Sequence, residues 1–387
     1  MIRRQTLTSP YSVSAEVLEV RSLLSAGAPA IVPHPGVQGH AAVHTSVVSQ
    51  LATNTPVTVS TIPANGDLNP YGVAFVPQGF VHGGMLNPGD LLVSNFNDSS
   101  NLQGTGTTII RVTPSGQVST FFPGQPGLGL TAALGVLKNG FVIVGSMPTT
   151  NNGTTPHPGE LLILNKNGQV VETLTNSKLI NGPWDLTINE HGPIAQVFVS
   201  NVLSGTVTRI DLLVPRGASK PIVLDETQIA SGFTHVPNSS ALVLGPTGLA
   251  LDVRTDTLFV ASTADNAIFA IHNATTRSTD AGIGKLVVQD LTHLHGPLGL
   301  VLAPDGDLIV ANGDAVNTDS NQPSEIVEFT QSGQFVAQFS LDPSVDGPFG
   351  IAIASENGRI RFAAVDDNDN MVSIWTLPEQ RHHLPPF

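Results

Sequence analysis

Six times along the chain, an apolar stretch ends in a polar side chain that could bind a cation. The six positions are Asn95, Ser146, Asn201, Ser262, Asn312 and, with a shift of one residue, Asp366. Amide and carboxylate oxygens are ligands that suit a hard cation such as Ca²⁺. Asn or Asp at such a place can instead close a turn through bonds from its side chain to the backbone. The sequence leaves both interpretations open.

Asp185 is the candidate whose position departs most from the pattern. It is the one charged residue at a repeated position that Gly or Ala occupies elsewhere, at residues 72, 133, 248, 299 and 350. A carboxylate at such a place is costly to remove from water, so it needs a partner, water or a ligand. A structural role and a binding role are equally compatible with this. With Ca²⁺ as the cation, the expected metal ligands are Asp185, Asn201, Asn312 and Asp366.

Aromatic residues form a third candidate group. Tyr71, Trp184 and Phe349 each follow the proline that opens a repeat, and the whole chain has only two Tyr and two Trp. Together they could form a stacking floor for a sugar or another flat ligand. Aromatic side chains at this place could equally pack against a neighbouring repeat.

Two further features concern loops. Long polar loops follow the second apolar stretch of the first, second and fifth repeats, as in "NFNDSSNLQGTG" at 95–106, and would raise a rim that could bind a partner; drift in loop length is the alternative. The histidines of "HLH", His293 and His295, have no accompanying zinc motif, so we expect a solvated loop there.

A repeat of about fifty residues must position these side chains. The phrases "PYGVAFVPQG", "PWDLTINEHG", "PTGLALDVRTD", "PLGLVLAPDG" and "PFGIAIASENG" are variants of one another, and "TAALGVLKNG" is a sixth copy without the proline. The copies begin 51 to 63 residues apart, and each continues into further short apolar stretches with tight turns between them. Four short strands per repeat predict an all-β fold, a six-bladed β-propeller. The candidate residues would then converge on the mouth of its central channel.

The last repeat lacks a fourth strand of its own. After Trp375 the chain runs into "PEQRHHLPPF", where proline cannot donate ladder hydrogen bonds. The alternating stretch "TPVTVSTIP" at 55–63 precedes the first repeat and is free to pair with residues 371–377. We therefore expect an N-terminal strand to close the ring, which removes the open sheet edges.

The repeats resemble those of the NHL family, whose blades run from proline and glycine through two apolar strands to a small residue and an acid or amide. The resemblance covers residues 55–377. It extends to the superfamily of gluconolactonase and virginiamycin B lyase, which implies a propeller and admits a metal-dependent enzyme. The chain departs from both enzymes: the first repeat offers Tyr71 and Asn95 but no glutamate as a metal ligand, and the lyase's repeated Trp-Phe-Thr-Glu ending is absent.

The chain before the repeats divides into two regions. The stretch "VLEVRSLLSAG" at 17–27 resembles the LEPR-XLL motif of secreted and surface bacterial proteins, with Val20 where the motif has proline. We expect a targeting region at 1–28, a flexible linker at 29–54, the propeller at 55–377 and a tail at 378–387. The resemblance implies an extracellular or cell-surface location; a tail without an address is the alternative.

Composition excludes several partners. The net charge of −14 repels a phosphate backbone, so nucleic acid is not expected as a partner. No apolar run reaches the length of a membrane-spanning helix, and the absence of cysteine excludes disulfides and thiolate chemistry. We expect a monomeric, noncatalytic scaffold that binds a protein or a small polar or carbohydrate ligand. The alternative is a metal-dependent propeller enzyme, a lactonase, hydrolase or lyase, with its site at the channel mouth.

Overall fold

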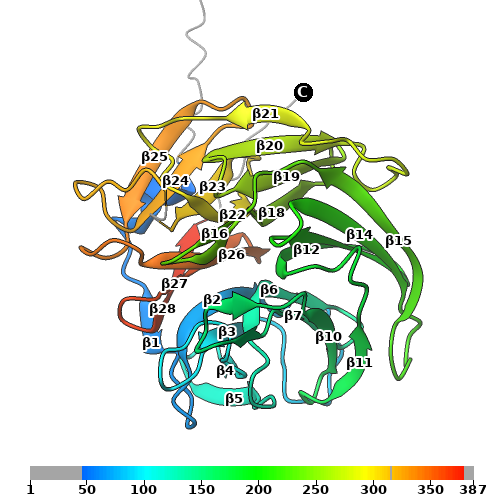
Figure 1. Cartoon of the computed structure of the whole chain (residues 1–387). Helices are drawn as coiled ribbons and strands as arrows, with labels where there is room; N and C mark the ends of the chain where they lie inside the picture. Colours follow the sequence, from blue (N-terminus) through cyan, green and yellow to red (C-terminus); the bar gives the residue numbers. More distant parts are fainter. Residues whose placement is uncertain (1–45, 314–315, 379–387) are drawn as a thin grey trace, which may run out of the picture. The chain divides into compact units, whose positions relative to one another are not determined.

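The computed structural model of the protein describes residues 46–313 and 316–378, all within the compact unit His44–Phe387. This unit consists of six four-stranded antiparallel sheets, arranged as the blades of a six-bladed β-propeller (Figure 1). The prediction of fold and blade number is therefore confirmed. No helix among the described residues is long and apolar enough to cross a membrane.

Each blade runs from an inner strand at the ring axis to an outer strand. Blade one has β2 (Leu68–Phe75), β3 (Leu91–Asn97), β4 (Ile109–Val112) and β5 (Val118–Phe122). Blade two has β6 (Leu130–Leu137), β7 (Phe141–Ser146), β10 (Glu160–Asn165) and β11 (Val170–Leu174). Blade three has β12 (Pro183–His191), β13 (Ile194–Asn201), β14 (Thr206–Leu213) and β15 (Ile222–Ser231).

The second half of the ring follows the same order. Blade four has β18 (Pro246–Asp252), β19 (Thr257–Ser262), β20 (Ala267–His272) and β21 (Lys285–Val288). Blade five has β22 (Pro297–Leu302), β23 (Leu308–Asn312), β24 (Glu325–Phe329) and β25 (Phe335–Ser340). Blade six has β26 (Pro348–Glu356), β27 (Arg359–Asp366), β28 (Met371–Pro378) and, as its outer strand, β1 (Val57–Ser60).

The N-terminal strand closes the ring as the sequence predicts. β1 pairs antiparallel with β28, from Val57 opposite Ile374 to Ser60 opposite Met371. The backbone N–H of Thr61 extends the pairing by donating to the oxygen of Asn370 at 2.9 Å. The two ends of the propeller are thus held together by strand pairing and the packing of one blade.

Glycine residues allow the inner strands of neighbouring blades to approach each other closely. Each inner strand contacts the inner strand of the next blade, and β26 contacts β2 to complete the circle. A Cβ atom added to Gly299 would stand 2.6 Å from the backbone oxygen of Phe349, and one added to Gly350 would collide with the backbone oxygen of Tyr71. The repeated glycine is therefore a requirement of packing between blades.

This packing gives a first testable expectation. Gly350→Ala should destabilise the propeller by about 1–3 kcal/mol, because β26 and β2 must separate to admit the methyl group. Ala133→Gly, at the equivalent position of blade two, is the matched control and should cost roughly 0.5–1 kcal/mol. Urea unfolding of both variants measures the difference, and equal losses would contradict the packing argument.

A short helix precedes the closing strand, where the sequence analysis expects flexible linker. Helix α1 (Val47–Leu51) is capped by Ser46, and Val47, Val48 and Leu51 are buried. The carboxylate of Glu328 on β24 accepts hydrogen bonds from the backbone N–H groups of Val47, at 3.3 Å, and Val48, at 2.9 Å, and from the Ser46 hydroxyl. The ordered unit therefore begins before residue 55, because a buried carboxylate and an apolar surface hold this segment.

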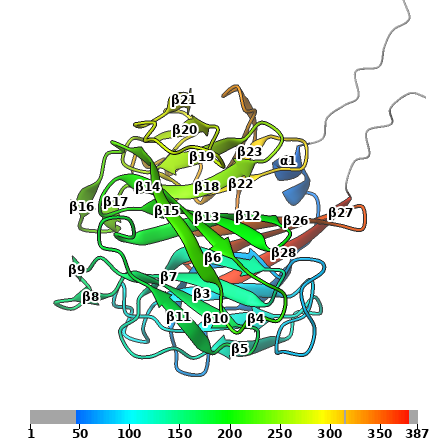
Figure 2. The same cartoon turned by 90° about the vertical axis from the view of Figure 1, so that its right-hand side faces the viewer.

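Two hairpins are inserted into the repeat. β8 (Thr149–Thr150) pairs with β9 (Thr155–Pro156) in the long loop of blade two, and β16 (Val236–Asn238) pairs with β17 (Leu242–Leu244) between blades three and four. Figure 2 shows both hairpins on one side of the propeller and α1 on the opposite side. The residues of the expected targeting motif, most of the linker and the tail after Pro378 lie outside the described residues.

Candidate functional site

The inner strands of all six blades enclose a cavity of about 330 Å³ at the ring axis. The side chains that line it are mostly apolar and include Val73, Leu134, Leu186, Leu249, Leu300 and Ile351, one from each blade, while polar groups make up about half of its surface. Among the described residues that line it, Asp185 alone is ionisable. The cavity therefore combines an apolar wall with one carboxyl group, a composition common in small-molecule sites.

Asp185 occupies a regular backbone position of the blade repeat. Its backbone N–H donates to the Oγ of Ser200 at 3.1 Å, as the N–H of Gly72 donates to the Oγ of Ser94 at 3.0 Å in blade one. The side chain then spans to blade four, where Oδ2 accepts from the backbone N–H of Leu249 at 3.3 Å. The carboxyl group thus bridges two blades while remaining part of the cavity wall.

The environment of Asp185 favours its uncharged form. Oδ1 accepts from the backbone N–H of Leu186 at 2.7 Å, and no cationic side chain of the described residues forms an ion pair with it. Burial raises the pKa of Asp185 to about 8, and the N–H groups of Leu186 and Leu249 offset only part of this rise. The carboxyl group therefore holds its proton more strongly than an exposed aspartate does, and an approaching cation would favour its ionised form.

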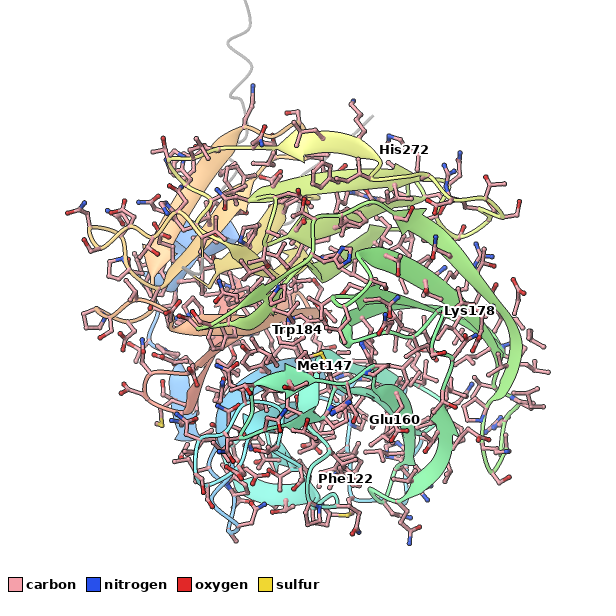
Figure 3. All side chains as sticks on the ribbon, in the orientation of Figure 1. Phe122, Met147, Glu160, Lys178, Trp184 and His272 are labelled. Carbon is pink, nitrogen blue, oxygen red and sulfur yellow. The ribbon has the colours of Figure 1, made fainter. Side chains whose placement is uncertain are left out.

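The predicted aromatic residues do come together. The ring of Tyr71 lies 5.5 Å from that of Trp184 and 4.7 Å from that of Phe349, and Phe96 completes the cluster at 5.0 Å from Tyr71. All four are buried, with Trp184 only 2% exposed. Figure 3 shows Trp184 and Met147 near the centre of the ring, and both belong to one apolar cluster with Leu242 of β17.

The rings of the aromatic cluster pack between the blades. The residues that follow these rings in β2, β12 and β26 line the cavity, so the cluster lies at the end where the inner strands begin. Burial, followed by the nearby carboxylates of Asp367 and Asp346, raises the pKa of the Tyr71 hydroxyl. Of the two interpretations offered by the sequence, burial supports packing between blades over an open stacking floor.

The three predicted amide ligands are buried inside their own blades. Each amide nitrogen donates to a backbone oxygen of the segment that leads into its blade: Asn95 to Thr61 at 3.2 Å, Asn201 to Leu179 at 3.1 Å and Asn312 to His293 at 2.8 Å. Each also donates to the third strand or its approach: Asn95 to Thr108, Asn201 to Thr208 and Asn312 to Glu325. These bonds match the turn-closing interpretation of the polar positions.

Asp366 lies in a different setting, at the end of β27. Its Oδ1 accepts from the backbone N–H of Asn368 at 3.1 Å, and ligand atoms of Asp342, Asp366 and Asp369 lie within 4.8 Å of one another. Burial, then the charges of Asp342 and Asp369, raise the pKa of Asp366 to about 6. No contact among the described residues joins Asp366 to the other expected metal ligands, so Ca²⁺ binding by that set stays a prediction.

Sequence reasoning missed two features of this region. The first is the central cavity: the repeated apolar residues of the inner strands predict its apolar side chains, but they do not show that a cavity is left between the strands. His295 is only 3% exposed and Glu325 is fully buried, so the expected solvated loop at "HLH" is wrong for His295.

No family model and no curated protein matches the sequence. Solved structures with a similar fold include virginiamycin B lyase from Staphylococcus aureus, with 16% identity and a TM-score of 0.44 over 84% of this chain and 89% of that chain. A gluconolactonase from Xanthomonas campestris has 13% identity and a TM-score of 0.48 over 86% and 93% of the two chains. The calcium-binding protein regucalcin from Agrobacterium tumefaciens has 12% identity and a TM-score of 0.49 over 82% and 92%. These similarities concern the fold and do not extend to a substrate or mechanism.

Proposed function

We propose that the protein is a noncatalytic binding propeller that takes a small, mainly apolar amine into its central cavity. The observation that carries this proposal is the position of Asp185, the one ionisable group among the described residues that line a cavity of about 330 Å³ with mostly apolar side chains. A cavity near this volume holds a small molecule rather than a polymer segment. The ligand would contribute its hydrocarbon part to the cavity wall and its polar end to Asp185.

The chemistry of Asp185 favours an amine over a neutral polar group. An ammonium group in the cavity gives the carboxylate the opposite charge that the protein itself does not supply there. A hydrogen bond between charged partners is worth about 1.5–3 kcal/mol, roughly a tenfold or greater preference over a neutral partner. Binding would require the proton of Asp185 to leave, so affinity should rise with pH up to the pKa of about 8.

The wider setting stays a prediction. The LEPR-XLL-like stretch at 17–27 supports export of this binder to the cell surface or the medium, and its residues lie outside the described part of the chain. A metal-dependent enzyme remains the alternative function. An enzyme of this kind needs metal ligands that lie close together. Among the described residues, no contact joins the four expected ligands to one another.

Calorimetric titration of the full chain with n-hexylamine and n-hexanol tests the proposal. At pH 8 we expect wild-type protein to bind hexylamine about tenfold more tightly than hexanol, with the preference falling toward pH 6. Asp185→Asn should lose the preference because it cannot carry the charge. Asp366→Asn, which removes another acid of raised pKa outside the cavity lining, is the matched control and should keep it. Equal hexylamine affinities for wild type and Asp185→Asn would overturn the proposal.

A further inference from the structure

A histidine and two acidic residues converge where the chain enters blade five. His295 precedes β22, Glu325 opens β24, and Asp319 lies in the connection that leads to β24. The Nε2 atom of His295 lies 3.7 Å from Oε1 of Glu325, and one ligand atom from each of the three side chains lies within 4.8 Å of the others. This group is separate from the central cavity, whose described lining includes none of these residues.

Both ring nitrogens of His295 face backbone oxygens. Nδ1 contacts the oxygen of Asn317, and Nε2 lies 3.0 Å from the oxygen of Thr292. A neutral imidazole has a single N–H, so one of these nitrogens would direct a lone pair at an acceptor. Around Nε2, the Thr292 oxygen and the Glu325 carboxylate place oxygen atoms of negative character where a cation would be favoured.

The surrounding hydrogen bonds would orient the three side chains for metal binding. In the tautomer that donates from Nδ1 to the Asn317 oxygen, the lone pair of Nε2 would be directed toward a metal ion beside Glu325. Asn312 donates from Nδ2 to Oε2 of Glu325 at 3.1 Å, which holds the carboxylate with Oε1 toward the histidine. The sequence analysis expects Asn312 to bind a metal directly, whereas the structure places it as a hydrogen-bond donor to Glu325.

We propose that His295, Glu325 and Asp319 bind a divalent first-row transition-metal ion, with Zn²⁺ as its representative. One imidazole nitrogen with carboxylate oxygens suits Zn²⁺, whereas Ca²⁺ takes oxygen ligands throughout. Two ligands held about 2.1 Å from a tetrahedral zinc ion are roughly 3.4 Å apart, close to the 3.7 Å between Nε2 and Oε1. The backbone oxygen of Thr292 stands within reach as a further ligand.

Zinc titration of chelator-treated full-length protein tests this assignment. By calorimetry at pH 7.5 we expect a site that is lost in His295→Gln and weakened about tenfold or more in Asp319→Asn. His272→Gln, which removes an exposed histidine at the end of β20, should leave it unchanged. Co²⁺ should give wild-type protein an intense visible absorption that His295→Gln lacks, and Ca²⁺ should not displace it.

Two results would overturn the assignment. The first is folded wild-type protein that takes up no zinc. Zinc affinity unchanged in both His295→Gln and Asp319→Asn would place any bound zinc elsewhere. If His295→Gln fails to fold, Asp319→Asn decides alone, because Asp319 is only partly buried in a connecting segment.

Discussion

Replacing Asp185 with asparagine should remove a large part of the pH dependence of folding stability. The pKa of Asp185 rises from 3.8 to about 8 in the folded protein because the cavity wall removes most of the water that would stabilise its charged form. Its stabilising contribution is therefore complete below pH 4 and is lost as pH rises toward 8, by up to about 1.4 kcal/mol per pH unit. Asparagine does not titrate, so this decline should disappear from the free energy of unfolding.

The curves of wild type and Asp185→Asn should cross. At pH 4 the variant should be less stable by about 1 kcal/mol, since its amide cannot accept both N–H bonds that Oδ1 and Oδ2 accept. At pH 9 it should be the more stable protein. Urea unfolding between these pH values measures both effects.

Asp366→Asn separates this effect from a general effect of removing an acid. The pKa of Asp366 rises only to about 6, because of burial and then the charges of Asp342 and Asp369. This variant should therefore change the slope below pH 6 and leave the slope between pH 6 and 8 as in wild type. Parallel curves for Asp185→Asn and wild type above pH 6 would rule out a neutral Asp185 in the native protein.

Truncation at the N-terminus should produce the largest loss of stability in the molecule. Deleting residues 1–63 removes β1, leaves the edge of β28 unpaired and takes away Val59 from the central apolar cluster. We expect this chain to lose cooperative unfolding, whereas a chain that begins at residue 46 should melt like the full-length protein. Differential scanning calorimetry distinguishes the two, and equal melting temperatures would contradict ring closure by β1.

A chain that begins at residue 54 tests the helix separately. It keeps β1 but loses α1, so the carboxylate of Glu328 loses the N–H groups of Val47 and Val48 and the hydroxyl of Ser46. An uncompensated buried carboxylate costs about 1–3 kcal/mol or more, so this chain should be clearly less stable than the chain from residue 46. Glu328→Gln should recover part of the loss in the shorter chain and destabilise the longer one.

Most of the fold could be predicted because it repeats. The repeated phrase occurs six times, five of them with its proline, and the strand missing after Trp375 has one apparent source at 55–63. Helix α1 could not be predicted, because five residues contain too little of a helical period and its stability comes from Glu328, far away in the sequence. The β16–β17 hairpin was missed because it interrupts the repeat and has no counterpart in the other blades.

The candidate site was less predictable. Asp185 attracted attention because it breaks the glycine pattern, and the structure places it in the cavity wall. The sequence does not predict the direction of the amide side chains of Asn95, Asn201 and Asn312. These residues end strands that are buried on both faces, so an amide could point into the blade or toward the axis. The sequence motifs around His295 do not reveal its surroundings, which come from Asn317 and Glu325, more than twenty residues away in the chain.

Helix α1 also has a mechanical meaning. A load applied to the chain at Ser46 would reach the propeller through the bonds to Glu328 and the burial of Val47 and Val48 before it reached β1. The helix would peel away first, and its release would lengthen the tether while the pairing of β1 with β28 still held. When the protein is pulled from its N-terminal side, helix α1 would thus detach before any strand does. The ring would remain closed until the released segment is fully extended and the force reaches β1.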